Sequence, residues 1–128
     1  MAHPRAFISF QMEDQWARGF LAQHAHSKNN QIEFLDYSVK EPFESKWKTN
    51  CKVRILATRG TIVLIGKTTY QSDAVTWEIE ETKRQGHGLF GIKIYRDEIC
   101  PMPTALQGYP VINWDFDAIV GELNKWQA

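Results

Sequence analysis

The sequence lacks long apolar runs and has no net charge. No apolar stretch approaches the roughly 20 residues that a membrane-spanning helix needs. Its 15 basic side chains balance 15 acidic ones, which argues against a uniformly basic nucleic-acid surface, though not against a local patch. The N-terminus does not read as a signal peptide with a small-residue cleavage site. We therefore expect a cytoplasmic protein without a membrane or nucleic-acid partner.

Cysteine is scarce as well. Cys51 and Cys100 are the only two, they lie far apart, and neither belongs to a CxxC motif. This usage is typical of reduced thiols in a cytosolic protein, and a disulfide between the two is neither required nor excluded. Cys51 falls on the apolar face of an expected helix, where a buried, inert thiol is more usual than a nucleophile.

Glycine is missing where a phosphate-binding loop would need it. The segment after the first expected strand, residues 9–14, contains none, which argues against an ordinary dinucleotide-binding or Walker-type site. The third expected strand ends in Ile65, Gly66 and Lys67, so the phosphoacceptor aspartate of a response-regulator receiver is absent too. His24 and His26 point to different sides of a helix, and no ligand-spaced set accompanies them, so we expect no metal site.

What the sequence does contain is a regular alternation of strand-like and helix-like segments. The 128 residues suit one domain, residues 1–128, with no repeat or low-complexity linker. The expected strands and helices follow one another as strands over 5–10, 31–36, 61–66, 89–95 and 111–113, and helices over 12–26, 45–58, 72–86 and 115–126. Such alternation predicts an α/β, flavodoxin-like fold with a five-stranded parallel sheet, order 2-1-3-4-5, and helices on both faces.

Several local features accompany this pattern. Asp14 is a plausible N-cap for the first helix, and Gly60 is expected to end the second. Residues 37–44 form a long loop of a kind that often carries function, and residues 96–109 read as irregular. The apolar faces of the first two helices are predicted to comprise Trp16, Ala17, Phe20, Leu21 and His24, and then Trp47, Cys51, Ile55 and Leu56.

The helix expected over 72–86 has the clearest start and stop signals in the chain. Ser72 is a good N-cap and Gly86 a natural residue just past the C-terminus. A buried stripe is expected at Val75, Ile79 and Thr82, with Glu78 at its border. A solvated acid is the usual outcome for such a glutamate, and it is the outcome expected for the next two acids, Glu80 and Glu81.

In a fold of this class, the ligand crevice lies at the carboxyl ends of strands one and three. The helix that carries Glu78 begins just after strand three. A lone carboxylate beside aromatic rings and hydroxyls suits cleavage of an N-glycosidic bond, because an anion stabilises an oxocarbenium-like transition state and a ring can stack a base. The residues expected near this crevice are Ser9, Phe10, Asp36, Ser38, Gly66, Trp77 and Glu78.

Five blocks of sequence, in order, resemble the TIR-like domains of the Thoeris ThsB type. The resemblance extends to about Tyr95, and its blocks are residues 5–14, 34–38, 47–50, 62–66 and 75–80. It implies a TIR fold and an NAD-consuming enzyme of bacterial antiphage defence. Such enzymes release nicotinamide and make a cyclic or conjugated ADP-ribose product that activates a separate effector. NAD is then a substrate, no cofactor is implied, and a phage-derived trigger is expected.

The resemblance also implies roles for individual residues. Glu78 matches the catalytic glutamate, and Ser9 and Phe10 match the loop that borders the nucleotide. Asp36 and Ser38 match a loop that lines the site and takes part in contacts between TIR domains, so self-association is expected. Trp77 matches the aromatic before the glutamate, more as a packing than a catalytic residue.

Two other functions stay open at this point. The first is a non-enzymatic scaffold that assembles through residues 37–44 and its helix faces. The second is an enzyme similar to nucleoside deoxyribosyltransferases, which share the α/β fold and the use of a carboxylate. The resemblance leaves the product, the trigger and the oligomer undetermined.

Overall fold

A computed structural model gives the structure of the chain and describes residues 5–27, 33–35 and 45–127. All four neighbouring strand pairs of its sheet are parallel, in the order β2-β1-β3-β4-β5. The α/β class and the parallel sheet are therefore confirmed. The strands are β1 (Arg5–Ser9), β2 (Glu33–Leu35), β3 (Gly60–Ile65), β4 (Gly88–Lys93) and β5 (Val111–Asn113).

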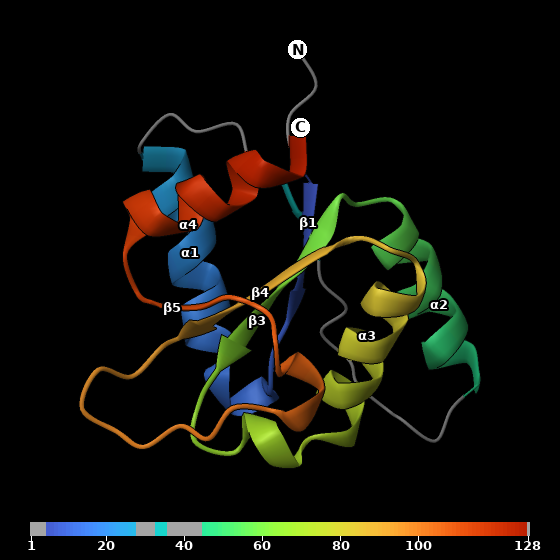
Figure 1. Cartoon of the computed structure of the whole chain (residues 1–128), viewed down its shortest axis with the longest axis horizontal. Coiled ribbons are helices and arrows are strands. Elements are labelled where there is room, and N and C mark those ends of the chain that lie inside the picture. The colour runs from blue at the N-terminus through green and yellow to red at the C-terminus, as the bar shows by residue number, and fades with distance from the viewer. Residues whose placement is uncertain (1–4, 28–32, 36–44, 128) are drawn as a thin grey trace.

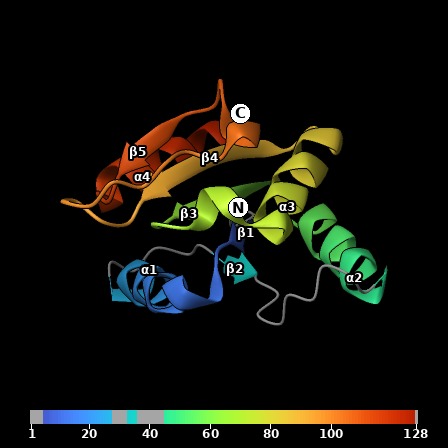
Figure 2. The same ribbon diagram turned by 90° about the horizontal axis from the view of Figure 1, so that it is seen from below.

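Helices cover both faces of the sheet. Figure 1 shows α1 and α4 on one side and α2 and α3 on the other, and Figure 2 shows the same division from below. Parallel strands need such crossover connections, since consecutive strands must start at the same end of the sheet. The helices are α1 (Gln15–Ser27), α2 (Ser45–Leu56), α3 (Asp73–Arg84) and α4 (Phe116–Asn124).

Side chains of β1 alternate between the two layers of the core. Ala6 and Ile8 belong to the apolar cluster under α1 and α4, whereas Phe7 packs with residues of α2 and α3. Ser9 follows the same alternation and faces α3. The period of two thus sends a hydroxyl, at the carboxyl end of a central strand, into the layer that holds Glu78.

The apolar faces of α1 and α2 are narrower than the sequence predicted. Ala17 and Leu21 are buried as expected, but Trp16, Phe20 and Leu56 are exposed, so their assignment to the buried faces was wrong. Ala17 and Leu21 are four residues apart and form a single stripe, which leaves their chain neighbours about 100° to one side. The Trp16 ring packs instead on the ring of Tyr95, with centroids 5.6 Å apart.

Gly60 opens β3 and does not end the preceding helix, contrary to the sequence prediction. The backbone pairs there with Ala6 on one side and Gly88 on the other. A Cβ at position 60 would lie 2.6 Å from the Gly88 carbonyl oxygen and 2.8 Å from the Trp126 ring. Close approach between neighbouring strands and the C-terminal indole, and not a helix stop, therefore explains this glycine.

The segment after β4 is irregular, as predicted, apart from one 3-10 turn at Thr104–Leu106. Cys100 and Leu106 turn inward and join the apolar cluster between the sheet and α3. Both cysteines are free thiols. The loop expected at residues 37–44 lies outside the described residues.

Candidate functional site

Helix α3 begins and ends as its sequence predicts. The Ser72 hydroxyl accepts a hydrogen bond from the Val75 backbone N–H at 3.1 Å. Gly86 has φ of 71°, a left-handed conformation that favours glycine after a helix C-terminus. The helix therefore starts just beyond the carboxyl end of β3, and the predicted stripe of Val75, Ile79 and Thr82 is buried.

Glu78 is completely buried, with 0% of its surface exposed, and so does not lie at the border of the buried face as expected. The Ser9 hydroxyl, at the end of β1, donates to Oε1 at 2.5 Å. The Cys51 thiol, on α2, donates to Oε2 at 3.6 Å. A buried carboxyl is costly unless it is hydrogen-bonded, and here groups from two other elements contact its two oxygens.

The other two acids of α3 differ from each other. Glu80 is exposed, as predicted, and pairs with Lys83 at 3.4 Å. Glu81 was expected to be solvated, but only 4% of its surface is exposed. Arg84 contacts its Oε1 and Gln85 donates to Oε2 at 2.8 Å, so neighbouring side chains cover the carboxylate and satisfy it.

Cys51 contacts Glu78, although the sequence did not predict it to lie at the candidate site. Its place on the apolar face of α2 predicted a buried thiol, and it is buried. The contact between Cys51 and Glu78 was not predictable from the sequence of α2 alone, because it forms only when α2 packs against α3. The Sγ–Oε2 distance of 3.6 Å marks a weak hydrogen bond, since a thiol is a poor donor.

Asp14 was not predicted to lie at the candidate site either, because its position in the sequence suggested an N-cap for the first helix. Its side chain is 1% exposed, and neither carboxylate oxygen has a hydrogen-bond partner among the described residues, so it does not cap α1. Burial, with a smaller contribution from Glu13, raises the pKa of Asp14 to about 6, while the nearby Thr69 hydroxyl and Lys67 oppose the shift.

Gly66 explains how the Asp14 carboxyl can lie so deep. A Cβ at position 66 would be only 2.7 Å from Cγ of Asp14, so the missing side chain leaves the space that the carboxyl occupies. The Gly66 backbone N–H donates to the Thr69 hydroxyl at 2.8 Å, which fixes the turn after β3. Asp14 follows β1 and Gly66 follows β3, so the two residues meet beyond the carboxyl ends of these strands. A fold of this topology places its ligand crevice there.

Phe10 and Trp77, two further predicted site residues, do not contact the Glu78 carboxyl in any described interaction. Phe10 is buried in the cluster under α1 and α4, on the opposite face of the sheet. Trp77 is half-buried and packs against the cluster formed by α2, α3 and β1. Asp36 and Ser38 lie outside the described residues.

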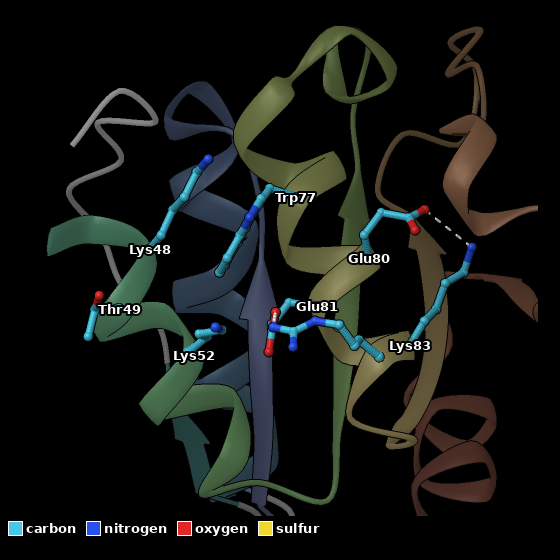
Figure 3. Close-up of a pocket in the computed structure, with 8 residues that line it drawn as sticks. Lys48, Thr49, Lys52, Trp77, Glu80, Glu81 and Lys83 are labelled. Carbon is cyan, nitrogen blue, oxygen red and sulfur yellow. Dashed lines mark hydrogen bonds and ion pairs between the residues drawn. The ribbon is translucent and has the colours of Figure 1, made fainter. Parts of the chain in front are cut away.

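Two surface hollows lie near the sheet and helices, and Glu78 lines neither of them. One, of about 590 Å³, lies between α2 and α3, with Trp77 on its wall (Figure 3). The other, of about 600 Å³, lies beyond β4 and β5 and is lined by Lys93, Arg96 and Trp114 among others.

Within the described residues, no three His, Cys, Asp or Glu side chains gather as potential metal ligands. None of the helices seen there is both long and apolar enough to cross a membrane. The described side chains near the carboxyl ends of β1 and β3 include two carboxyls, from Glu78 and Asp14, with the Ser9 hydroxyl and the Cys51 thiol beside Glu78. A carboxylate in such surroundings can stabilise positive charge and accept hydrogen bonds from a ligand's hydroxyls.

Solved structures with the same fold include TIR domains. The TIR domain of the Toll-related receptor TRR-2 from Hydra magnipapillata has a TM-score of 0.67 and 16% identity, over 96% of this chain and 98% of the other. A prokaryotic SEFIR domain has a TM-score of 0.58 and 12% identity, over 95% and 94%. The TIR domains of the activated Roq1 resistosome, which recognises the pathogen effector XopQ, have a TM-score of 0.50 and 16% identity, over 72% of this chain and 59% of that one.

These identities are low, so the solved structures show the fold alone. Comparison with curated protein sequences gave no match. The family described as "Thoeris protein ThsB, TIR-like domain" matches residues 7–99, which extend from within β1 to just beyond β4. The chain therefore belongs to the family of ThsB-type TIR-like domains.

Proposed function

We propose that this domain consumes NAD by breaking the bond between nicotinamide and ribose. The observation that carries the proposal is Glu78, a completely buried carboxyl fixed by Ser9 from β1 and Cys51 from α2. An apolar residue would fill this position at lower cost, since a carboxyl must be removed from water to lie there. A hydrogen-bonded carboxyl at the carboxyl edge of the sheet, where this fold places its ligand crevice, supports a chemical role.

In this reaction, the N-glycosidic electron pair leaves with nicotinamide. Positive charge then develops on the ribose C1 and ring oxygen, and the Glu78 carboxylate stabilises it while accepting hydrogen bonds from the ribose hydroxyls. A nucleophile captures C1 and completes the transfer. An internal nucleophile gives a cyclic ADP-ribose product, another molecule gives a conjugate, and water gives ADP-ribose with release of a proton.

Ser9 is the positioning residue in this scheme. Its hydrogen bond to Oε1 limits rotation of the carboxyl and sets the direction in which the remaining lone pairs point. Gly66 and the backbone at Phe10 border the same end of the sheet, and Asp36 and Ser38 keep the roles that the family resemblance implies. Trp77 contributes to packing between α2 and α3.

Because Glu78 has no exposed surface, the groups that cover it must move before NAD can reach it. We propose that self-association through contacts between TIR domains drives this change, after a phage-derived trigger. The product then acts as the small-molecule signal for a separate effector. An isolated subunit is accordingly expected to turn NAD over slowly, and an assembled one faster.

A non-enzymatic scaffold is the second candidate, and the same burial favours it. Glu78 already has hydrogen-bonding neighbours at both oxygens, as a purely structural carboxyl would. A scaffold would self-associate or bind a partner without any loss of NAD, at every protein concentration. Turnover by the assembled protein therefore separates the two candidates.

The test is mass spectrometry of the small molecules formed from NAD by the wild type and by Glu78→Gln, each as free subunits and as forced oligomers. Glu78→Gln keeps the size of the side chain but removes its charge, and we expect NAD turnover to fall by a factor of about 100 or more. Glu122→Gln is the matched control, because Glu122 lies on α4 on the opposite face. It should leave turnover unchanged.

Two results would contradict the proposal. Wild-type turnover in a folded Glu78→Gln variant would remove Glu78 from the mechanism. No NAD loss by the assembled wild type would favour the scaffold.

A further inference from the structure

The hollow between α2 and α3 has its own chemistry, separate from that of Glu78. Figure 3 shows Lys48, Thr49 and Lys52 along α2, with the Trp77 ring lying between the two helices. Lys83 and its acidic neighbours line the α3 side. Of the residues that line the hollow, only Trp77 was expected to belong to a ligand site.

The charges of this hollow do not cancel, although those of the whole chain do. Four cationic side chains line it against two acidic ones. Both acids are engaged on α3 itself, Glu80 with Lys83 and Glu81 with Arg84. Lys48 and Lys52 are exposed and form no ion pair with any part of the chain that the structure describes.

Placing two lysines four residues apart on a helix is mildly unfavourable without an anion between them. Here the same face also contains Thr49, whose hydroxyl can donate or accept a hydrogen bond. These groups are suited to hold phosphate oxygens, with lysine acting as a point charge. A wall made by the half-buried Trp77 adds a flat, polarizable surface on which a planar base can stack.

The volume of about 590 Å³ is in the range that accommodates a ligand of nucleotide size. We propose that the α2–α3 hollow, lined by Lys48, Thr49, Lys52 and Trp77, binds a phosphorylated nucleotide, with its phosphates on the lysines and its base on the indole. This is a second site, distinct from the one at Glu78. Its occupancy does not require that the domain cleave NAD.

Chain connectivity ties this hollow to the buried carboxyl. Lys52 directly follows Cys51, which contacts Glu78, and Trp77 directly precedes Glu78 on α3. A ligand that draws α2 and α3 together or apart would therefore change the spacing between the Cys51 thiol and the Glu78 carboxyl. A nucleotide bound here is in a position to regulate whatever chemistry Glu78 performs.

The test measures binding of three probes, ADP, pyrophosphate and adenosine, by isothermal titration calorimetry without NAD. We expect ADP to bind more tightly than either fragment, because only ADP has both a base and a diphosphate. Lys48→Ala combined with Lys52→Ala should weaken the affinity for ADP by a factor of about 10 or more, since two phosphate contacts are lost. Lys93→Ala with Lys125→Ala, two exposed lysines outside the hollow, is the matched control and should leave ADP affinity unchanged.

Trp77→Leu tests the stacking of the base separately and keeps an apolar side chain beside α2. It should weaken the affinity for ADP by a factor of about 5 or more. The affinity for pyrophosphate should be unchanged, which also verifies that the variant is folded. The proposal is overturned if the wild type does not bind ADP, or if the Lys48/Lys52 variant binds it as tightly as the wild type. Equal affinities for ADP and pyrophosphate would overturn the assignment of the base to Trp77.

Discussion

Two carboxyl groups are buried near the carboxyl edge of the sheet, and they are held in opposite ways. Glu78 has Ser9 at one oxygen and Cys51 at the other. Asp14 is equally inaccessible, yet neither of its oxygens has a hydrogen-bond partner in the parts of the chain that the structure describes. One carboxyl is fixed by donors, and the other occupies a space that Gly66 leaves open.

The contrast shows that burial alone does not specify what a carboxyl does. Donors from two separate elements hold Glu78 in one orientation, which suits a group that must meet a substrate at a fixed angle. Burial, with a smaller contribution from Glu13, disfavours the charged form of Asp14 and raises its pKa to about 6. Asp14 therefore lowers the stability of the folded state near neutral pH.

The largest effect expected from this difference is a pH-dependent gain of stability in Asp14→Asn. The folded pKa of Asp14, about 6, is above its ordinary value of 3.8, so its favourable contribution is complete below pH 4 and is lost as pH rises to 6. A tenfold change in proton affinity is about 1.4 kcal/mol, so the loss is on the order of 3 kcal/mol. Asparagine has no charge to bury, so the variant should unfold several degrees higher than the wild type at pH 7.5 and at about the same temperature at pH 4.

Thermal unfolding followed by circular dichroism from pH 4 to pH 7.5 measures this difference. Asp97→Asn, at an exposed loop position, is the control and should show no such trend. A stability difference between Asp14→Asn and the wild type that does not vary with pH would show that Asp14 is not buried as a costly charge.

The next effect concerns the space that holds the Asp14 carboxyl. Gly66→Ala would put a methyl group against that carboxyl and should cost about 1–3 kcal/mol of unfolding free energy. Asp14→Ala should remove most of this cost when the two changes are combined, because the methyl then has room. Urea unfolding of the two single variants and the double variant gives the coupling energy. Additive losses would mean that Gly66 is required for another reason.

The fold was largely predictable because it depends on local signals. Helix α3 is specified by its own residues, namely the cap at Ser72, the apolar stripe through Val75 and Ile79, and Gly86. Strand β3 is apolar on both faces, as a central strand should be. Gly60 was misread because a glycine after a helix can end it or open a strand. The choice depends on Trp126 and Gly88, which are distant in sequence and pack against it.

The candidate site was predictable only in part. Glu78 and Ser9 could be placed near one crevice from the strand order, but their hydrogen bond follows from side-chain direction at the end of β1. The same alternation puts Phe10 on the far face, which a list of neighbouring residues does not reveal. Cys51 and Asp14 were missed because their partners, Glu78 and Gly66, come from elements far away in the chain.

A smaller effect is expected from the hydroxyl that fixes Glu78. Ser9→Ala leaves Oε1 without its donor and should destabilise the fold by about 1–2 kcal/mol. Combined with Glu78→Gln, the loss should be less than additive, with a coupling of about 1 kcal/mol. If the domain turns over NAD, Ser9→Ala should lower kcat more than it raises KM, because the carboxyl is then less well aligned. Strict additivity in the stability cycle would show that the bond contributes little.

The smallest effect is expected from the thiol on the other oxygen. Cys51→Ser keeps the shape of the side chain and replaces a weak donor with a stronger one, so its stability should differ from that of the wild type by less than about 1 kcal/mol. In a cycle with Glu78→Gln, the coupling should be at most about 0.5 kcal/mol, because the Sγ–Oε2 distance is 3.6 Å and S–H donates poorly. Urea unfolding of the same four proteins provides the measurement. A Cys51 coupling as large as that of Ser9 would mean that the two oxygens of Glu78 are held equally, and that Ser9 alone does not set the orientation of the carboxyl.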